Sequence, residues 1–318
     1  LNKDEQKIVV FNTDDKKLVR EIPLKGEGQN NVGRVFSFSV FTEDSIILSS
    51  GPFPFNCVIN RNGEKIGKFE IQWRDGFEQT VDYTSLESRY YTDLSNDPDA
   101  VYFLQRVPYV GFKPAEISHF PIVKYDKNKK EYIPLGFKYP KDYWAKSLPD
   151  NMTFNHNDES LFFGLVSDHN LYVLSKKTDE VEKHYLKSKY APKKMNNTLD
   201  FQGPDDVMLF DAMNPRYTAL IPDPYRKLYY RIVCLPPSDL SLAKAKPTQL
   251  HFYPDRFSIM VLDEKMDLIH EEEFPERQYY PHGIFVTKEG INIPKTHPEY
   301  FVKLGNESEF VYDVFTLR

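Results

Sequence analysis

The stretch from Arg216 to Cys234, RYTALIPDPYRKLYYRIVC, constrains the fold of this chain more than any other segment. Two runs rich in β-branched and aromatic residues, Tyr217 to Ile221 and Leu228 to Val233, flank the sequence Pro-Asp-Pro-Tyr. Strand-forming residues on both sides of turn-forming residues predict a β-hairpin. Because the same pattern recurs along the chain, the sequence predicts a series of antiparallel modules.

The predicted hairpins fall into two alternating sets. The outer set has polar turns, of which Asn62-Gly63 is the strongest hairpin signal, and covers residues 8–24, 58–71, 121–137, 171–186 and 257–274. The inner set has less polar strands and covers residues 35–49, 90–104, 152–166, 217–233 and 283–293. A single strand, residues 310–317, is expected after the last inner hairpin.

Alternating hairpins predict an all-β protein, a β-propeller of antiparallel four-stranded blades, in one domain over residues 1–318. The first outer hairpin has no inner partner and the last module lacks strands, so we expect the N- and C-terminal strands to close the ring. The count favours six blades, with five or seven as alternatives. No segment sustains a 3.6-residue apolar period, and only short pieces such as Leu240 to Lys246 have a helix-friendly composition.

Composition restricts the partners of the chain. Its 318 residues carry a net charge of −6 with acidic and basic residues interspersed, which argues against nucleic acid. No apolar run reaches the about 18 residues of a membrane span. Since the chain starts at Leu1, we expect that an upstream segment has been removed. Cys57 and Cys234 lie in apolar runs and are expected to be buried thiols, with a disulfide as the alternative.

Several strand and turn motifs resemble a known family. They are Gly26-Glu27-Gly28 through Val32-Gly33, the run from Asp223 to Arg231, the strand from Phe257 to Asp263, and Val311 to Phe315. In this order they resemble an uncharacterised family of bacterial cell-envelope proteins, often lipoproteins, with a predicted propeller fold. The resemblance implies export and anchoring through an upstream lipidated cysteine. It implies no activity.

Motifs that would carry known chemistry are absent from the sequence. It contains no Gly-x-Ser-x-Gly elbow, Walker loop, HExxH pair or Cys-x-x-Cys pair. The segment from Asp93 to Asp99 spaces oxygen atoms as a calcium loop does, but it lacks the glycine at the sixth position and has Leu104 at the closing position. We interpret it as an Asx-rich turn, and expect neither a metal nor a cofactor.

The propeller topology predicts one candidate site. Loops that enter the innermost strands open at one mouth of the central channel, so residues before the inner hairpins should converge there. These residues are Arg34, Arg89, Asn151, Arg216 and His282. Arginines can hold a carboxylate or another anion through paired donors, and Tyr90, Tyr217, Tyr279 and Tyr280 could stack on a sugar or peptide.

A structural role is the alternative for these residues. Arginines before strands commonly form salt bridges to a neighbouring blade, which would leave no site for a ligand. The group formed by Asp223, Tyr225, Arg226 and Arg231 is likewise expected to hold adjacent blades together through a turn and a strand face.

Three functions fit the sequence. The first is a non-enzymatic propeller that binds a ligand or partner protein at the cell envelope, such as an anionic sugar or peptide at the channel mouth. The second is a glycan-active hydrolase or lyase, for which Asp205 and Asp206 are the nearest carboxylates. The third is an interaction module without a small-molecule site.

Overall fold

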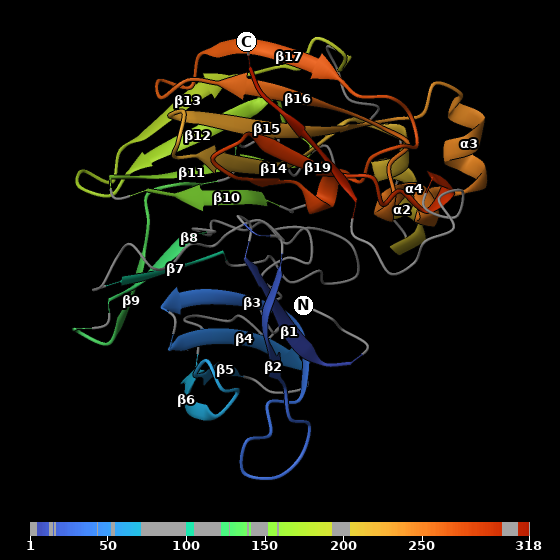
Figure 1. Ribbon diagram of the computed structural model, residues 1–318. Helices are drawn as coiled ribbons and strands as arrows, with labels where there is room; N and C mark the ends of the chain where they lie inside the picture. Colours follow the sequence, from blue (N-terminus) through green and yellow to red (C-terminus); the bar gives the residue numbers. More distant parts are fainter. Residues whose placement is uncertain are drawn as a thin grey trace. The chain divides into compact units, whose positions relative to one another are not determined.

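In the part of the chain that the computed structural model (Figure 1) describes, the strands form six antiparallel sheets and the helices are short. The described residues are 5–12, 15, 17–42, 44–51, 55–70, 100–104, 122–126, 128–138, 140, 152–157, 159–192, 204–300 and 311–317. They belong to two compact units. The first takes its residues from Leu1–Pro108, Ser118–Lys138 and His156–Glu159, and the second from Tyr109–Ile117, Tyr139–Asn155 and Ser160–Arg318.

The first unit contains a hairpin, a four-stranded sheet and a three-stranded sheet, each with strands in sequence order. The hairpin is β1 (Lys7–Asn12) and β2 (Lys17–Pro23). The four-stranded sheet is β3 (Arg34–Thr42), β4 (Ser45–Gly51), β5 (Phe55–Ile59) and β6 (Lys65–Glu70). The three-stranded sheet is β7 (Ala100–Leu104), β8 (Ile122–Asp126) and β9 (Glu131–Pro134).

Apolar side chains join the β1–β2 hairpin to the neighbouring sheet. Ile8 and Ile22 of the hairpin pack in one buried cluster with Ile46, Leu48 and Ile59 of strands β4 and β5. A two-stranded hairpin alone is marginally stable in water. Burial against the four-stranded sheet therefore stabilises β1 and β2.

Gly63 sets the turn between β5 and β6. Its φ is 78°, and a Cβ at this position would clash with the carbonyl oxygen of Pro23. We expect Gly63→Ala to lower the free energy of unfolding by about 2 kcal/mol or more, measured by urea denaturation. Gly26→Ala is the matched control, because its Cβ would meet no atom within 4 Å; equal stability of the two variants would contradict the role of Gly63.

The second unit contains two four-stranded sheets and a three-stranded sheet, again in sequence order. The first sheet is β10 (Met152–His156), β11 (Ser160–Leu165), β12 (Asn170–Ser175) and β13 (Val181–Tyr185). The second is β14 (Arg216–Asp223), β15 (Leu228–Leu235), β16 (Arg256–Leu262) and β17 (Leu268–Glu273). The third is β18 (Phe285–Val286), β19 (Ile291–Pro294) and β20 (Tyr312–Phe315).

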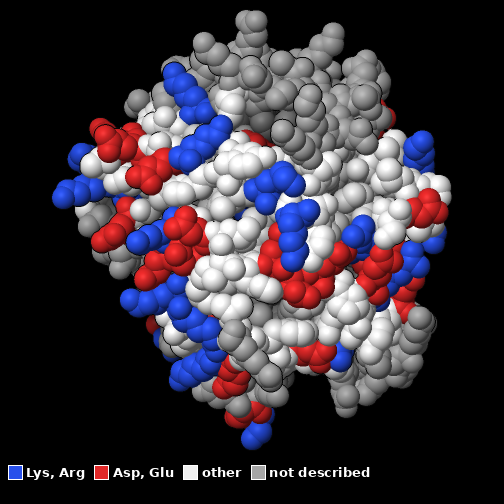
Figure 2. Space-filling view, turned by 90° about the horizontal axis from the view of Figure 1, so that it is seen from above, with Lys and Arg blue, Asp and Glu red and all other residues white. Residues whose placement is uncertain are grey.

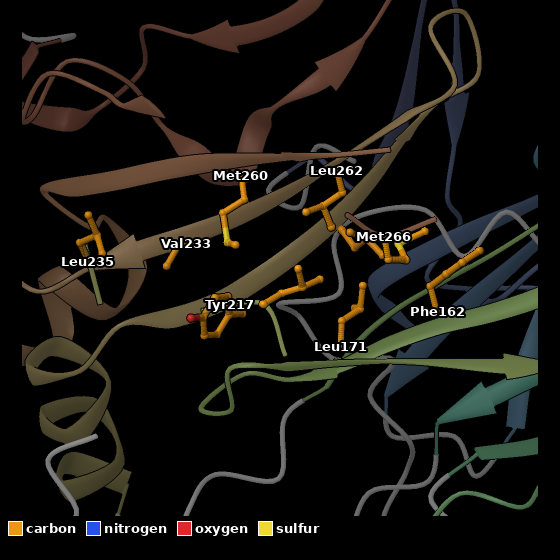
Figure 3. Close-up of a cluster of buried hydrophobic side chains, with 10 residues drawn as sticks. Phe162, Leu171, Tyr217, Val233, Leu235, Met260, Leu262 and Met266 are labelled. Carbon is orange, nitrogen blue, oxygen red and sulfur yellow. The ribbon is translucent and has the colours of Figure 1, made fainter. Parts of the chain in front are cut away.

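The core of the second unit lies between its two four-stranded sheets. Figure 3 shows Phe162 and Leu171 of the first sheet with Tyr217, Met260 and Leu262 of the second in one buried cluster. The inner strands also meet directly, since the Tyr217 N–H donates to the Val166 oxygen at 2.8 Å and the Asn155 amide to the Leu220 oxygen at 3.0 Å. Sheets that face each other with interdigitated apolar side chains form a continuous core.

The second unit has two different ends. At one end, tight turns at residues 224–227, 263–267 and 287–290 connect β14 to β15, β16 to β17 and β18 to β19. The opposite end carries long connections that hold α2 (Pro204–Met213), α3 (Leu240–Ala245), α4 (Pro247–Phe252) and the 3₁₀ helix η1 (Pro281–Gly283). We call this opposite end, where β14 and β18 begin, the long-loop end.

The structure confirms an all-β protein with several four-stranded antiparallel sheets. The five outer hairpins form as predicted, and so do four of the inner ones. Of the fifth, residues 90–104, the structure describes only β7 and so tests only that strand. Both cysteines are free and buried, as expected. Helix α2 was not predicted. The single domain and the closed ring stay predictions.

Candidate functional site

Three connections of the second unit meet at the long-loop end. Helix α2 precedes β14, helices α3 and α4 lie between β15 and β16, and η1 precedes β18. Figure 1 shows α2, α3 and α4 together at this end, and the buried residues Ala212, Ala243 and Leu250 join them. Long connections on a rigid sheet scaffold are common places for binding residues, so this end is the candidate functional site.

Local sequence signals explain the two short helices between β15 and β16. The Asp239 carboxylate caps α3 by accepting a hydrogen bond from the Ser241 N–H at 2.9 Å, which lowers the pKa of Asp239. Helix α4 begins at Pro247, which suits a first helical turn. It ends where the Tyr253 N–H donates to the Gln249 oxygen at 2.7 Å. The backbone that carries Tyr253 is therefore fixed.

Arg216 is buried at the start of β14 and is bound by the protein itself. Its guanidinium lies 3.5 Å from the Asp211 carboxylate at the end of α2 and donates to the His251 carbonyl oxygen at 3.0 Å. The His251 ring is 2.9 Å from the same carboxylate. The side chain that was predicted to bind an anion thus joins α2 to α4, and these partners belong to the connections of its own sheet and not to a neighbouring one.

His282, the other predicted residue at this end, contacts an aromatic ring. Its ring contacts the ring of Tyr280 with centroids 5.4 Å apart, and Tyr280 contacts Tyr253 at the same centroid distance. Tyr253 is 37% exposed, and His282 and Tyr280 are half-buried. The structure therefore places Tyr280 and His282 at one aromatic surface, which we call the aromatic cluster together with Tyr253.

Tyr217 lies in the core, in contact with a second buried arginine. The Arg231 guanidinium lies over its ring at 3.7 Å, a cation–π geometry. The Tyr217 hydroxyl is 2.7 Å from Nδ1 of His169 and accepts a hydrogen bond from the Ser188 N–H at 3.1 Å. Burial raises the pKa of Tyr217 and lowers that of His169. The phenol therefore stays protonated and the imidazole neutral near pH 7.

The remaining predicted residues lie in several places. Arg34 is exposed at the start of β3 in the first unit. Arg89, Tyr90 and Asn151 lie outside the described residues. Tyr279 is buried, and its hydroxyl donates to the Asp313 carboxylate at 2.6 Å. Convergence of the arginines at a channel mouth stays a prediction.

At the tight-turn end, the predicted Asp223 group joins adjacent sheets. The buried Asp223 carboxylate accepts hydrogen bonds from the Arg226 guanidinium at 3.0 Å and the Tyr230 hydroxyl at 2.8 Å. The same guanidinium donates to the Thr287 oxygen at 3.2 Å, in the turn after β18. Arg226 therefore connects the β14–β15 turn to the next sheet, in agreement with the structural interpretation of this group.

Sequence reasoning missed Tyr253 and His251. Both lie in or directly after a short helix between β15 and β16, a connection that the hairpin pattern treats only as a loop. The run His251-Phe252-Tyr253 was the available signal, because three ring residues in a polar connection are unusual. Phe252 and Tyr253 are 41% and 37% exposed.

Carboxylates and histidines do not form a metal site in the described part of the chain. Asp205 is exposed and Asp206 half-buried on the first turn of α2. The segment from Asp93 to Asp99 lies outside the described residues. Among the described helices, none has the length and hydropathy to cross a membrane.

The buried His297 should make the protein less stable in acid. It is fully buried, with Nε2 3.7 Å from Asp255 and Nδ1 accepting from the Glu299 N–H at 3.3 Å, while Arg277 pairs with both carboxylates. Burial lowers the pKa of His297, and Asp255 and Glu299 oppose this shift. The folded protein then binds the proton less tightly than the unfolded chain, so the free energy of unfolding should fall below about pH 6.5.

Urea denaturation between about pH 7 and pH 5 checks this sign. His297→Gln should make the decrease shallower, whereas His270→Gln on the exposed face of β17 should leave it unchanged. His169 contributes in the same direction, so a residual decrease is expected. An unchanged slope in His297→Gln would show that this imidazole does not titrate differently in the two states.

Together the fold and the long-loop end define an all-β protein of consecutive antiparallel sheets, in which polar groups join the sheets and aromatic rings are exposed on long connections. The chain belongs to the family described as "Domain of unknown function (DUF4221)", whose model matches residues 1–273. No curated protein sequence matches the chain.

Two solved structures share this fold. A member of the same family from Bacteroides vulgatus is 20% identical, with a TM-score of 0.73 over 98% of this chain and 85% of that chain. A predicted exported protein from Bacteroides fragilis is 11% identical, with a TM-score of 0.55 over 99% of this chain and 87% of that chain. At these identities the likeness concerns the fold alone.

Proposed function

We propose that this protein is a non-enzymatic β-propeller scaffold that binds a ligand or partner protein at the bacterial cell envelope. The aromatic cluster at the long-loop end carries the proposal: its rings are partly exposed on a fixed backbone, whereas Arg216 and Tyr217 are used inside the protein. Binding surfaces combine such rigid rings with polar groups that fix orientation.

The proposed scaffold consists of six blades closed by the N- and C-terminal strands. The consecutive four-stranded sheets and the contacts between inner strands of the second unit support this arrangement. An experimental structure whose sheets do not share one central axis would contradict it.

The proposed location is the cell envelope, reached through an upstream segment that carries a lipidated cysteine. The predicted export of the similar B. fragilis protein supports this location. Fractionation of cells that express the full-length gene should place the protein in the envelope fraction, and recovery in the cytoplasm would contradict the proposal.

Thermal-shift measurements with neutral sugars, uronic acids and peptides test the binding function. A ligand that binds only the folded protein raises its stability, by about 2.7 kcal/mol at a hundred times Kd. We expect at least one class to raise the Tm, and Tyr280→Ala to abolish the shift. If no class raises the Tm, the small-ligand form of the proposal fails, and a purely structural module becomes the better description.

A glycan-active hydrolase is the second candidate. Asp205 and Asp206 are at least partly accessible on the first turn of α2, at the long-loop end. Glycoside hydrolysis requires two carboxyl groups about 5 to 9.5 Å apart. Turnover of polysaccharide fragments that Asp206→Asn abolishes would favour the enzyme, and binding without turnover would favour the scaffold.

A further inference from the structure

Resting on the proposed binding function, we infer that the aromatic cluster of Tyr253, Tyr280 and His282 binds pyranose rings of a neutral glycan. The Tyr253 and Tyr280 rings lie 5.4 Å apart with their planes 36° from parallel, and the His282 ring stands at 75° to Tyr280. Tyr280 thus contacts both other rings, one tilted and one nearly edge-on, so the three rings do not form a flat stack. Ring faces carry partial negative charge, which suits the weakly positive C–H groups of a sugar ring.

The cluster is positioned before any ligand arrives. The Tyr253 N–H donates to the Gln249 oxygen at 2.7 Å, the Tyr280 N–H to the Pro294 oxygen at 2.8 Å, and the Gly283 N–H to the Tyr280 oxygen at 3.2 Å. The buried contacts of Arg216 with Asp211 and with the His251 carbonyl fix the C-terminal end of α4, which Tyr253 follows directly. Preorganised rings with few rotatable bonds lose little entropy on binding.

The charges near the cluster argue against an anionic ligand. Asp255, two residues after Tyr253, pairs with Arg277 at 2.8 Å, and Arg277 also lies 3.4 Å from Glu299. Arg256 pairs in the same way with Glu273 and Glu276. Figure 2 likewise shows both signs interspersed over the described part of one face of the molecule. Two guanidiniums thus face four carboxylates, and the excess of negative charge disfavours an anionic ligand such as a uronic acid.

The chemistry of the rings favours a polyol over an aliphatic protein surface. The tyrosine hydroxyls and the imidazole add polar atoms to the apolar area of the rings. Arg277 and Glu299 are partly exposed near Asp255, which follows Tyr253 by two residues, and offer further donors and acceptors. A site that combines ring faces with polar edges matches one face and the rim of a pyranose.

Affinity gel electrophoresis with neutral polysaccharides (a galactan, a mannan, a xylan and a dextran) tests the inference, with polygalacturonate as the charged comparison. We expect at least one neutral polymer to retard the protein. Tyr253→Ala and Tyr280→Ala should each weaken retardation about tenfold, and Tyr253→Phe should retain it. Tyr225→Ala is the matched control, because Tyr225 is 54% exposed at the opposite, tight-turn end.

The outcomes distinguish failure of the glycan inference from failure of the proposed binding function. Absence of retardation by all four neutral polymers overturns the glycan assignment, and so does retardation that Tyr225→Ala reduces as much as Tyr280→Ala. If a peptide or uronic acid raises the Tm in a Tyr280-dependent way while neutral glycans do not bind, the binding scaffold stands and the glycan inference falls. Equal Tm values of the variants without ligand exclude misfolding as the cause.

Discussion

The Arg231→Met variant should lose about 3–5 kcal/mol of its free energy of unfolding. Arg231 is 1% exposed on β15, and its guanidinium donates to four backbone carbonyls. The acceptors are the oxygens of Asp168, His169, Asn170 and Leu186, at 2.9 to 3.2 Å. Methionine fills a similar volume but leaves these buried acceptors without their donors, and it removes the cation from the face of Tyr217.

Among the described residues, backbone carbonyls and no directly bonded carboxylate surround the charge of Arg231. Burial lowers its pKa to about 10, so the side chain is still protonated at neutral pH. Carbonyl dipoles and the Tyr217 ring therefore replace water around a full charge. Because these acceptors lie just before and at the start of β12 and directly after β13, the side chain fastens one four-stranded sheet to the next.

Urea denaturation of Arg231→Met, Arg231→Lys and Arg256→Ala checks this expectation. Lysine keeps the charge but cannot present the planar fork of donors, so an intermediate loss is expected. Arg256 lies in the same sheet in a partly exposed ion pair with Glu273, and its removal should cost about 1 kcal/mol or less. Losses of similar size in Arg231→Met and Arg256→Ala would show that the hydrogen bonds of Arg231 to the four carbonyls contribute little to stability.

The hairpins were predictable because their determinants are local. Alternating apolar residues around a turn such as Asn62-Gly63 specify both strands within about a dozen residues, and β5 and β6 pair around that turn. Helix α2 was not predictable in this way. Its apolar residues Val207 to Phe210 are consecutive and form no 3.6-residue stripe, and packing against α3 and α4 stabilises it.

The candidate site was only partly predictable because its geometry depends on distant segments. Arg216 and His282 were expected to lie near each other because both precede inner strands, and in the structure both lie at the long-loop end of the second unit. The sequence carried no signal that Arg216 would be bound by Asp211 and by the His251 carbonyl. Nor did the sequence indicate that Tyr253 contacts Tyr280, because these rings come from two separate connections.

Glu271 makes a second connection between the same two sheets, and Glu271→Leu should cost about 3 kcal/mol or more. This carboxylate is 4% exposed on the outer strand β17. It accepts hydrogen bonds from the hydroxyls of Ser188 at 2.5 Å and Ser258 at 2.7 Å, and from the Lys189 N–H at 2.8 Å. Leucine would leave two buried hydroxyls and one partly buried N–H without this acceptor.

The isosteric Glu271→Gln separates charge from shape. Its amide nitrogen would have to face either the Lys189 N–H or the serine hydroxyls, so one acceptor is lost while the volume is kept; we expect about 1–3 kcal/mol. Glu272→Gln, on the exposed face of the same strand with 62% of its side chain accessible, should change stability by less than about 0.5 kcal/mol. Equal effects at the two positions would contradict the buried role of Glu271.

The Arg231 and Glu271 connections should also be coupled. Arg231 binds the Leu186 carbonyl and Glu271 binds Ser188 and Lys189, so both hold the segment that leaves β13. The Ser188 N–H in turn donates to Tyr217, over whose ring Arg231 lies. Once one connection is broken, the segment after β13 shifts, and this shift already weakens the hydrogen bonds of the other connection. In a double-mutant cycle, Arg231→Met with Glu271→Gln should therefore cost less than the two single losses added, by about 0.5 kcal/mol or more. Strict additivity would mean that the two residues fasten the sheets independently.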